Sequence, residues 1–214
     1  PAQDHKRVGD GDTGLNTGGM GAYCPAPLGT PALREHVTRT VLQPIVETMS
    51  RLGSPFQGVL YAGLMVVNGM PYVLEFNARM GDPETQVVLP LLKTDLLDVI
   101  EAVIEHRLDQ LRVEWHHDTA VCVVMTSGGY PGQYQNGFPL HGLQGEAAAH
   151  ALVFHAGTAR KNDAVVTAGG RVLGITGQGA TLKEAQTEAY KAVSAISFEG
   201  CHYRKDIAHR AVTS

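Results

Sequence analysis

Two apolar runs joined by Asn68-Gly69 set the strongest constraint on the fold of this 214-residue chain. Asn-Gly is a preferred dipeptide for a two-residue turn between antiparallel strands, because both turn positions need a positive φ. Residues 56–67 are nearly all apolar, and the apolar pattern resumes at residue 71. We therefore predict a hairpin in which residues 56–67 form a central strand and residues 71–77 form the antiparallel return strand.

The return strand ends in polar residues that are predicted to share one face. Side chains alternate along a strand, so Glu75, Asn77 and Arg79 should point the same way. Carboxylate and amide oxygens are the ligands that hard cations prefer, which makes Glu75 and Asn77 candidate magnesium ligands and Arg79 a candidate for binding an anion beside the metal. The alternative is a strand with one face in solvent, for which alternating polarity is the ordinary pattern.

Two neighbouring features favour a ligand site over a solvated face. The segment Gly81-Asp82-Pro83-Glu84 predicts a turn into a helix, with Pro83 at the first helical position and Asp82 either capping the helix or binding a ligand hydroxyl. Near the N-terminus, glycines recur at positions 9, 11, 14, 18, 19 and 21 between polar residues. Such a segment cannot pack a core, but its backbone N–H groups can approach an anion closely.

Composition narrows the class of protein. The chain is 43% apolar and 18% charged, enough for one large domain or two small ones. Its formal net charge of −4 and the lack of a Lys/Arg run argue against nucleic acid and anionic membranes, so small molecules are the expected partners. Neither a membrane-length apolar stretch nor a signal segment is evident, which predicts a cytoplasmic location. Three widely spaced cysteines predict neither a disulfide framework nor a zinc site.

Helical periodicity occupies three further stretches, at residues 31–52, 84–92 and 94–108. Pro44 predicts a kink or a break in the first stretch, because proline removes a helix hydrogen bond. Thr94 is the predicted N-cap of the third. The polar residues 109–118 then separate this region from a second one.

The second region combines short strands with one helix. Strands are predicted at 119–126, 152–155, 164–168 and 171–176, with the last two joined as a hairpin at Gly169-Gly170. Thr181 and Glu184 have the spacing of a capping box, which predicts a helix to residue 196. The glycine pairs at 128–129 and 169–170 are either structural turns or part of a segment that closes a substrate pocket.

Several motifs together resemble the glycinamide ribonucleotide synthetase (phosphoribosylamine–glycine ligase) family of the ATP-grasp superfamily. The Glu-x-Asn-x-Arg element would fit many ATP-grasp enzymes, and its combination with the glycine loop and Gly-Asp-Pro-Glu is far more specific. The likeness spans essentially the whole chain and includes these motifs: Asp4-His5-Lys6-Arg7, Asn16-Thr17-Gly18-Gly19-Met20-Gly21-Ala22-Tyr23, Glu75 to Glu84, Leu89-Pro90-Leu91-Leu92, Phe154-His155-Ala156-Gly157-Thr158, Gly169-Gly170-Arg171-Val172-Leu173 and Tyr203-Arg204-Lys205-Asp206-Ile207.

The resemblance implies an α+β fold. Residues 1–108 would be the antiparallel-sheet, C-terminal part of an ATP-grasp catalytic domain. Residues 109–118 would be a linker, and residues 119–214 a small α+β C-terminal domain. The chain resembles the carboxy-terminal half of the synthetase, without the amino-terminal phosphate-binding domain or the nucleotide-clamping small domain. No ligase turnover is therefore expected from this chain alone, and the missing amino-terminal half is the expected protein partner.

The family's activity supplies roles for the candidate residues. Similar enzymes use ATP and magnesium or manganese to phosphorylate glycine, and the amine of 5-phosphoribosylamine then attacks the glycyl phosphate. Glu75 and Asn77 match the metal ligands, and Arg79 would stabilise charge on the transferred group. The remaining roles fall to residues near the glycine loop and the following turn: Asp4 as a catalytic residue, Asn16, Thr17, Gly18, Gly19, Met20 and Asp82 as substrate-binding residues, and Lys6 and Arg7 as nucleotide-phosphate residues.

One departure from the superfamily pattern concerns the metal. Many other ATP-grasp enzymes carry an acidic ligand on the preceding strand, where this chain has Gly63, so fewer protein ligands would hold the metal here. Two alternatives to the ligase half stay open. The chain could belong to a different ATP-grasp carboxylate–amine ligase, or it could be a non-catalytic globular module.

Overall fold

The computed structural model describes residues 1–212, which form two compact units. The sheet unit consists of residues 1–26, 82–91 and the chain from residue 117 onward, and the hairpin unit consists of residues 27–81 and 92–116. This division differs from the contiguous ranges 1–108 and 119–214 expected from the sequence, because strands near the N-terminus pair with the strand that opens the second range. The last two residues of the expected C-terminal domain lie outside the described residues.

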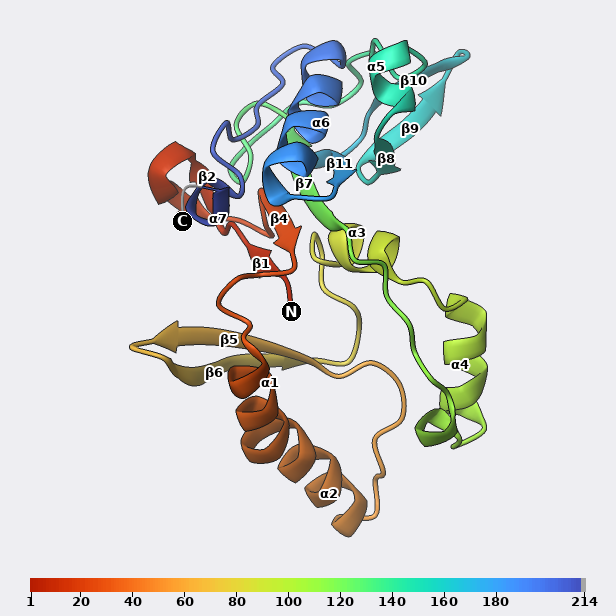
Figure 1. Ribbon diagram of the computed structural model, residues 1–214. Helices are drawn as coiled ribbons and strands as arrows, with labels where there is room; N and C mark the ends of the chain where they lie inside the picture. The colour runs from red at the N-terminus through yellow and green to blue at the C-terminus, as the bar shows by residue number, and fades with distance from the viewer. Residues whose placement is uncertain (213–214) are drawn as a thin grey trace. The chain divides into compact units, whose positions relative to one another are not determined.

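A five-stranded antiparallel sheet organises the sheet unit, in the order β1-β4-β7-β11-β8 (Figure 1). The strands are β1 (Gln3–Asp4), β4 (Gly21–Cys24), β7 (Thr119–Thr126), β11 (Arg171–Gly179) and β8 (Leu152–His155). The register places Ala22 opposite Cys122, and Ile175 opposite Val123. The segment just before β4 is thereby attached to a strand about 100 positions away in the chain.

Helix α6 (Leu182–Ala195) packs on β7 and β11 through small buried residues, Ala185, Ala189 and Ala192 (Figure 1). The predicted capping box at its N-terminus is confirmed. Thr181 Oγ1 accepts the Glu184 N–H, and Glu184 Oε2 accepts the Thr181 N–H, each at 3.2 Å. Together the two bonds satisfy two of the backbone donors that a helix start leaves unpaired.

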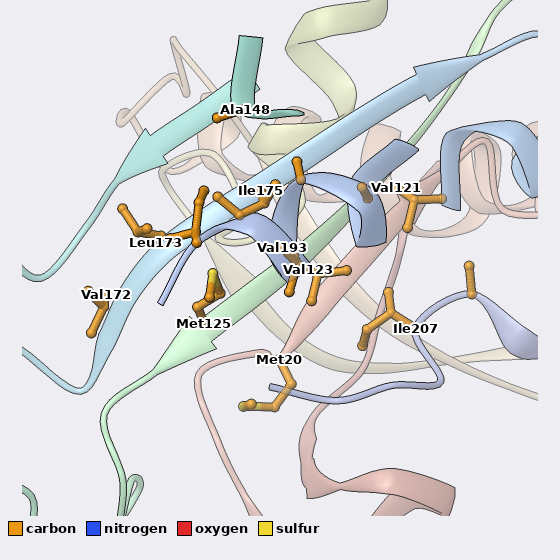
Figure 2. Packing of buried hydrophobic residues seen from close by; sticks show 14 of the residues in the cluster. Met20, Val121, Val123, Met125, Ala148, Val172, Leu173, Ile175, Val193 and Ile207 are labelled. Carbon is orange, nitrogen blue, oxygen red and sulfur yellow. The ribbon is translucent and has the colours of Figure 1, made fainter. Parts of the chain in front are cut away.

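The core of the sheet unit lies between this helix, the sheet and the C-terminal segment. Figure 2 shows Val123 and Met125 of β7 and Ile175 of β11 among its members, with Met20 and Ile207 at its edge. All five side chains are fully buried. The other elements of the unit are β2 (Arg7–Gly9), β3 (Thr13–Asn16), α3 (Thr85–Val88), α5 (Glu146–Ala149), β9 (Thr158–Lys161), β10 (Ala164–Thr167), α7 (His209–Val212) and the 3-10 turns Asp10–Asp12 and Leu89–Leu91.

The hairpin unit contains the predicted hairpin and the first long helical stretch. Its elements are α1 (Pro31–Val37), a π turn (Thr38–Leu42), α2 (Gln43–Arg51), β5 (Tyr61–Val67), β6 (Met70–Asn77), α4 (Leu96–Ile104) and the 3-10 turn Leu108–Gln110. The π turn ends at Leu42, two positions before Pro44. The predicted interruption of the helix is thus confirmed as a local change of hydrogen bonding, which relieves the clash of the proline ring with the preceding turn.

Three expectations about individual elements are wrong. Residues 56–60 are not strand, and β5 belongs to a two-stranded ribbon rather than the centre of a sheet. Asp95, not Thr94, caps α4, because Asp95 Oδ1 accepts the Leu97 N–H at 2.8 Å while the Thr94 hydroxyl accepts the Glu114 N–H. Pro83 precedes the first helical residue of α3 by two positions.

The predicted hairpin across Gly169-Gly170 is also wrong. β10 pairs with β9, a strand that was not predicted, whereas β11 pairs with β7 and β8. Residues 169–170 therefore connect two different sheets. Their carbonyls accept hydrogen bonds from Ser127, at the end of β7, which ties this connection to the five-stranded sheet. Among residues 1–212 we find no helix with the length and apolar character that a membrane crossing requires.

Candidate functional site

The β5–β6 hairpin has the turn that its sequence predicts. Val67 pairs with Met70 on either side of Asn68-Gly69, which confirms the two-residue connection. The register shifts once, so that Gly63 faces Glu75 while Leu64 faces Val73, and Leu74 is the extra residue of a bulge.

Glu75 and Asn77 follow the bulge and remain two positions apart on one strand. They pair with Gly63 and Tyr61 respectively, and therefore share a face as predicted. Strand β6 ends at Asn77, so alternation does not place Arg79. The Arg79 guanidinium instead donates through Nη1 to the Met80 carbonyl at 3.0 Å. The predicted polar row is thus two residues long, and Arg79 belongs to the turn that follows.

The chemistry of this pair fits a hard cation. The Asn77 Nδ2 atom is buried and has no hydrogen-bond partner within the described part of the chain. A buried amide without a partner is costly, and turning the amide over would present its carbonyl oxygen to a cation at the same place. The Glu75 carboxylate supplies a second oxygen donor. Within residues 1–212 no group of three His, Cys, Asp or Glu side chains is placed to hold a metal ion, so water and phosphate oxygens would have to complete the coordination.

Gly63 explains why no third carboxylate joins the pair from β5. A Cβ atom at this position would lie 2.9 Å from Cγ of Glu75, its partner across the ribbon. An acidic side chain at position 63 would therefore displace the Glu75 side chain. Glu75 occupies the space that such a residue would need.

A second group of predicted site residues gathers in the sheet unit around Asp4. Asp4 lies on β1 and its side chain is only 7% exposed. Lys6 Nζ lies 2.6 Å from Asp4 Oδ2, and apart from this ion pair the two carboxylate oxygens accept no hydrogen bond from the described residues. Burial raises the pKa of Asp4 to about 6, against the opposing effect of the Lys6 ammonium.

The loop at residues 16–20 is fastened to the segment that follows Asp4. The Thr17 N–H and hydroxyl both donate to the Lys6 carbonyl, at 2.7 and 2.9 Å, and the Met20 N–H donates to the His5 carbonyl at 2.8 Å. Gly19 has a φ of +118°, and a Cβ there would lie 2.8 Å from Asp4 Oδ1 and 2.3 Å from the Pro83 ring. Only glycine allows the loop to approach both the buried carboxylate and the Asp82–Pro83 turn.

Asp82 is held by a residue that the sequence interpretation did not assign to the site. Arg171 Nη2 lies 2.7 Å from Asp82 Oδ2, and its Nη1 donates to the Asp82 carbonyl at 3.2 Å and to the Gly18 carbonyl at 2.9 Å. Gln86 Nε2 donates to Asp82 Oδ1 at 2.9 Å. Arg171 entered the sequence interpretation only within the Gly169-Gly170-Arg171 motif, because a single arginine after two glycines carries no local signal of a site.

The predicted residues therefore fall into two groups, one in each unit. Asp4, Asp82 and the 16–20 loop lie together in the sheet unit, with Lys6 paired to Asp4. Arg7 donates to the Gly14 carbonyl on the neighbouring part of the glycine loop. In the hairpin unit, Glu75 and Asn77 share a face and Arg79 follows in the turn.

Comparisons with known proteins identify the family to which the chain is similar. Residues 1–85 match the family described as phosphoribosylglycinamide synthetase, ATP-grasp (A) domain, and residues 120–210 match the phosphoribosylglycinamide synthetase C domain. A phosphoribosylamine–glycine ligase from Synechocystis sp. is 53% identical over 214 residues, which cover 99% of this chain and 51% of that protein. The one from Caldanaerobacter subterraneus is 50% identical and is covered to 49% of its length.

A crystal structure of phosphoribosylamine–glycine ligase from Thermotoga maritima superposes with a TM-score of 0.87 at 37% sequence identity, and the match covers 97% of this chain and 51% of that one. The chain spans about half the length of the curated relatives it matches. The two family matches together cover most of residues 1–214. The described residues have the expected mixture of helix and antiparallel sheet. The chain belongs to the phosphoribosylglycinamide synthetase family of ATP-grasp enzymes and corresponds to the C-terminal half of its members.

Proposed function

We propose that this chain forms the metal-binding and substrate-binding part of an ATP-dependent ligase that joins glycine to 5-phosphoribosylamine. The observation that carries the proposal is the pair of candidate oxygen donors on β6: Asn77, whose buried Nδ2 atom has no hydrogen-bond partner among the described residues, lies two positions from the Glu75 carboxylate. The names of the relatives supply the substrates, since the proteins from Synechocystis sp. and Caldanaerobacter subterraneus, about 50% identical to this chain, are named phosphoribosylamine–glycine ligase.

The reaction has two steps with a balanced transfer of atoms. A carboxylate oxygen of glycine attacks the γ-phosphorus of ATP, the bond to the bridging oxygen breaks, and glycyl phosphate and ADP form. The amine of 5-phosphoribosylamine then attacks the acyl carbon, the carbon–oxygen bond breaks, and phosphate leaves with that oxygen. Glycinamide ribonucleotide is the product. Catalysis of such transfers depends mainly on holding the reactants in line and neutralising charge.

Each group of residues has a part in these steps. Glu75 and Asn77 would hold magnesium or manganese, which when bound neutralises phosphate charge. Arg79 places a fixed cation beside the transferred phosphoryl group. Asp4 and the 16–20 loop shape the pocket for glycine and its acyl phosphate, and Asp82 binds the ribosyl or amine part of the second substrate. Lys6 and Arg7 are secondary candidates for phosphate contacts, because Lys6 also pairs with Asp4 and Arg7 with the glycine loop.

The hairpin unit supports the proposal that further residues of the same protein complete the site. Apolar side chains are exposed on both strands of the β5–β6 hairpin: Leu74 is 65% exposed, Tyr72 59%, Met70 54% and Met65 51%. An isolated two-stranded hairpin is marginally stable in water, and exposed apolar clusters usually mark an interface. We infer that the complete protein contains a part equivalent to the half of its relatives that this chain does not span. That part would cover the hairpin, and turnover would need both halves.

The proposal is tested by mutating Glu75 to Gln in the complete protein. Product formation from ATP, glycine and 5-phosphoribosylamine should fall about 100- to 1,000-fold, because an uncharged amide replaces the one carboxylate of the metal site. Binding of Mn²⁺, measured by electron paramagnetic resonance, should weaken in parallel, and the circular dichroism spectrum should not change. The matched control is Glu101→Gln, at an exposed carboxylate on α4, with wild-type turnover expected.

Two results would contradict the proposal in different ways. If Glu75→Gln kept wild-type turnover and metal binding, the face of β6 that carries Glu75 and Asn77 would have no catalytic role. ATP hydrolysis or ligation that proceeds with another carboxylate and amine, but not with this pair, would assign the chain to a different carboxylate–amine ligase.

A further inference from the structure

We propose that Arg171 is a positioning residue of the substrate site and that Tyr130 completes its hold on the 16–20 loop. The inference rests on the proposed function for its kinetic consequences, whereas its structural consequences are independent of the reaction. Neither residue is among the predicted metal, nucleotide or substrate ligands.

Arg171 joins the two segments that carry the predicted substrate residues. The Arg171 guanidinium contacts the Gly18 carbonyl on the loop and both the carbonyl and the carboxylate of Asp82, at 2.7 to 3.2 Å. Gly18 and Asp82 are more than 60 positions apart in the chain. The planar guanidinium has five donors in a fixed fork, so a single arginine can set the distance and the angle between two segments at once.

Tyr130 binds the backbone N–H of Gly18, the loop residue whose carbonyl Arg171 binds. The Gly18 N–H donates to Tyr130 Oη at 3.0 Å, so side chains bind both the N–H and the carbonyl of Gly18. The guanidinium also lies flat enough against Gly18 that a Cβ at this position would be 3.1 Å from Arg171 Cζ. Because both peptide groups that flank the Gly18 Cα are held, this part of the loop has little freedom to rotate.

Arg171 and Tyr130, which together form a clamp on Gly18, are linked to each other through neighbouring residues. Tyr130 follows β7 and Arg171 opens β11, and the intervening Ser127 donates from its N–H and its hydroxyl to the carbonyls of Gly170 and Gly169, each at 2.8 Å. The Tyr130 ring fills the space beside Gly170, where a Cβ would lie 2.3 Å from the ring. The glycine pair at 169–170 is thus a structural turn that positions Arg171 next to the 16–20 loop and Asp82.

The Arg171–Asp82 ion pair is poorly suited to a purely stabilising role. The Asp82 side chain is 51% exposed, and an ion pair with a half-exposed partner adds little to folding stability. The loop that Arg171 holds also approaches the buried Asp4 carboxylate, because a Cβ at Gly19 would lie 2.8 Å from Asp4 Oδ1. The expected effect of Arg171 is therefore on where the loop and Asp82 lie, and only weakly on whether the protein folds.

The kinetic test uses Arg171→Met and Arg171→Lys in the complete protein. In Arg171→Met the KM values for glycine and 5-phosphoribosylamine should each rise about tenfold or more, because interactions that bind the substrates uniformly change KM rather than kcat. The KM for ATP should stay within about twofold. Arg171→Lys should recover part of the loss, since an ammonium keeps the charge but not the fork. The control is Arg112→Ala, at an arginine that is 91% exposed and pairs with Glu114 at 3.7 Å.

Tyr130→Phe separates the two halves of the clamp. It removes only the hydroxyl that binds the loop, so the KM for glycine should rise about threefold while the KM for 5-phosphoribosylamine stays near the wild-type value. The double variant Asp82→Asn with Arg171→Met should raise the KM for 5-phosphoribosylamine no further than the larger single effect, because the two side chains act through one contact.

Amide hydrogen exchange keeps the inference testable apart from the reaction. Exchange of the Gly18, Gly19 and Met20 amides should accelerate about tenfold in Arg171→Met. If the wild-type protein makes no product, the proposed function fails while this measurement still tests the clamp. If the wild-type protein ligates, the inference is overturned by unchanged KM values, or by a fall in kcat and melting temperature with KM values and loop exchange unchanged.

Discussion

Asp4→Asn should stabilise the protein at neutral and alkaline pH. The Asp4 side chain is 7% exposed, and burial raises its pKa from the usual 3.8 to about 6 despite the nearby Lys6 ammonium. A raised carboxyl pKa means that the folded state binds this proton more tightly than the unfolded state. The contribution of Asp4 to stability is therefore fully present below pH 3.8, and it is lost as the pH rises through about 6.

The magnitude follows from the two pKa values. The difference between them corresponds to about 3 kcal/mol of unfavourable free energy at pH 8, and to about half of that at pH 5. An asparagine has almost the same shape and carries no charge, so it removes this cost. For an unfolding unit of this size, about 3 kcal/mol raises the melting temperature by roughly 6–12 °C.

Thermal unfolding of the complete protein between pH 5 and pH 8 measures the effect. The difference between Asp4→Asn and wild type should grow with pH and level off above pH 7, while ligase activity falls because the carboxylate is gone. The control is Asp118→Asn, at an exposed residue before β7, which should show no comparable rise. An Asp4→Asn variant that is no more stable than wild type at pH 8, or whose advantage is the same at every pH, would refute the reasoning.

Four further substitutions test how the sheet unit is held together. Arg204→Met should cost about 3–5 kcal/mol of unfolding free energy, because Arg204 is fully buried and both Asp12 and Asp206 would lose its guanidinium as a partner. Arg210→Ala, at the exposed end of the same network, should cost less than about 1 kcal/mol. If the network were not buried as described, urea titrations would show a larger loss of unfolding free energy in Arg210→Ala than in Arg204→Met. Thr181→Ala should cost about 1 kcal/mol through the lost cap of α6, seen as a lower urea midpoint. Gly170→Ala should cost about 1–3 kcal/mol because the added methyl meets the Tyr130 ring, and Gly170→Ala with wild-type stability would contradict the close packing.

Features that depend on a few neighbouring residues could be predicted from the sequence. Asn68-Gly69 determines a two-residue hairpin through its backbone preferences, and the register of β5 and β6 between the turn and the bulge at Leu74 follows from it. The capping box of α6 is equally local, since Thr181 and Glu184 bond only to each other's backbone. The alternation of Glu75 and Asn77 is correct because both residues lie beyond the bulge at Leu74.

Features that depend on distant pairing could not be predicted. Nothing in residues 21–24 indicates that they pair with residues 120–123, and β1, which carries Asp4, joins the sheet only by pairing with those residues 21–24. The ion pair between Asp82 and Arg171 joins positions 89 apart, so neither local sequence shows it. The mistaken hairpin across Gly169-Gly170 has the same origin, because two glycines predict a turn but do not say which strands it connects.

The fate of a glycine oxygen tests the central claim most directly. The complete protein would be supplied with ATP, 5-phosphoribosylamine and glycine labelled with ¹⁸O in its carboxylate. Ligation through glycyl phosphate predicts that one labelled oxygen per turnover appears in inorganic phosphate, detected by mass spectrometry or by the ³¹P isotope shift, and that Glu75→Gln greatly slows this transfer. Unlabelled phosphate released at the full rate of ATP consumption, or label transfer that is unchanged by Glu75→Gln, would contradict the account.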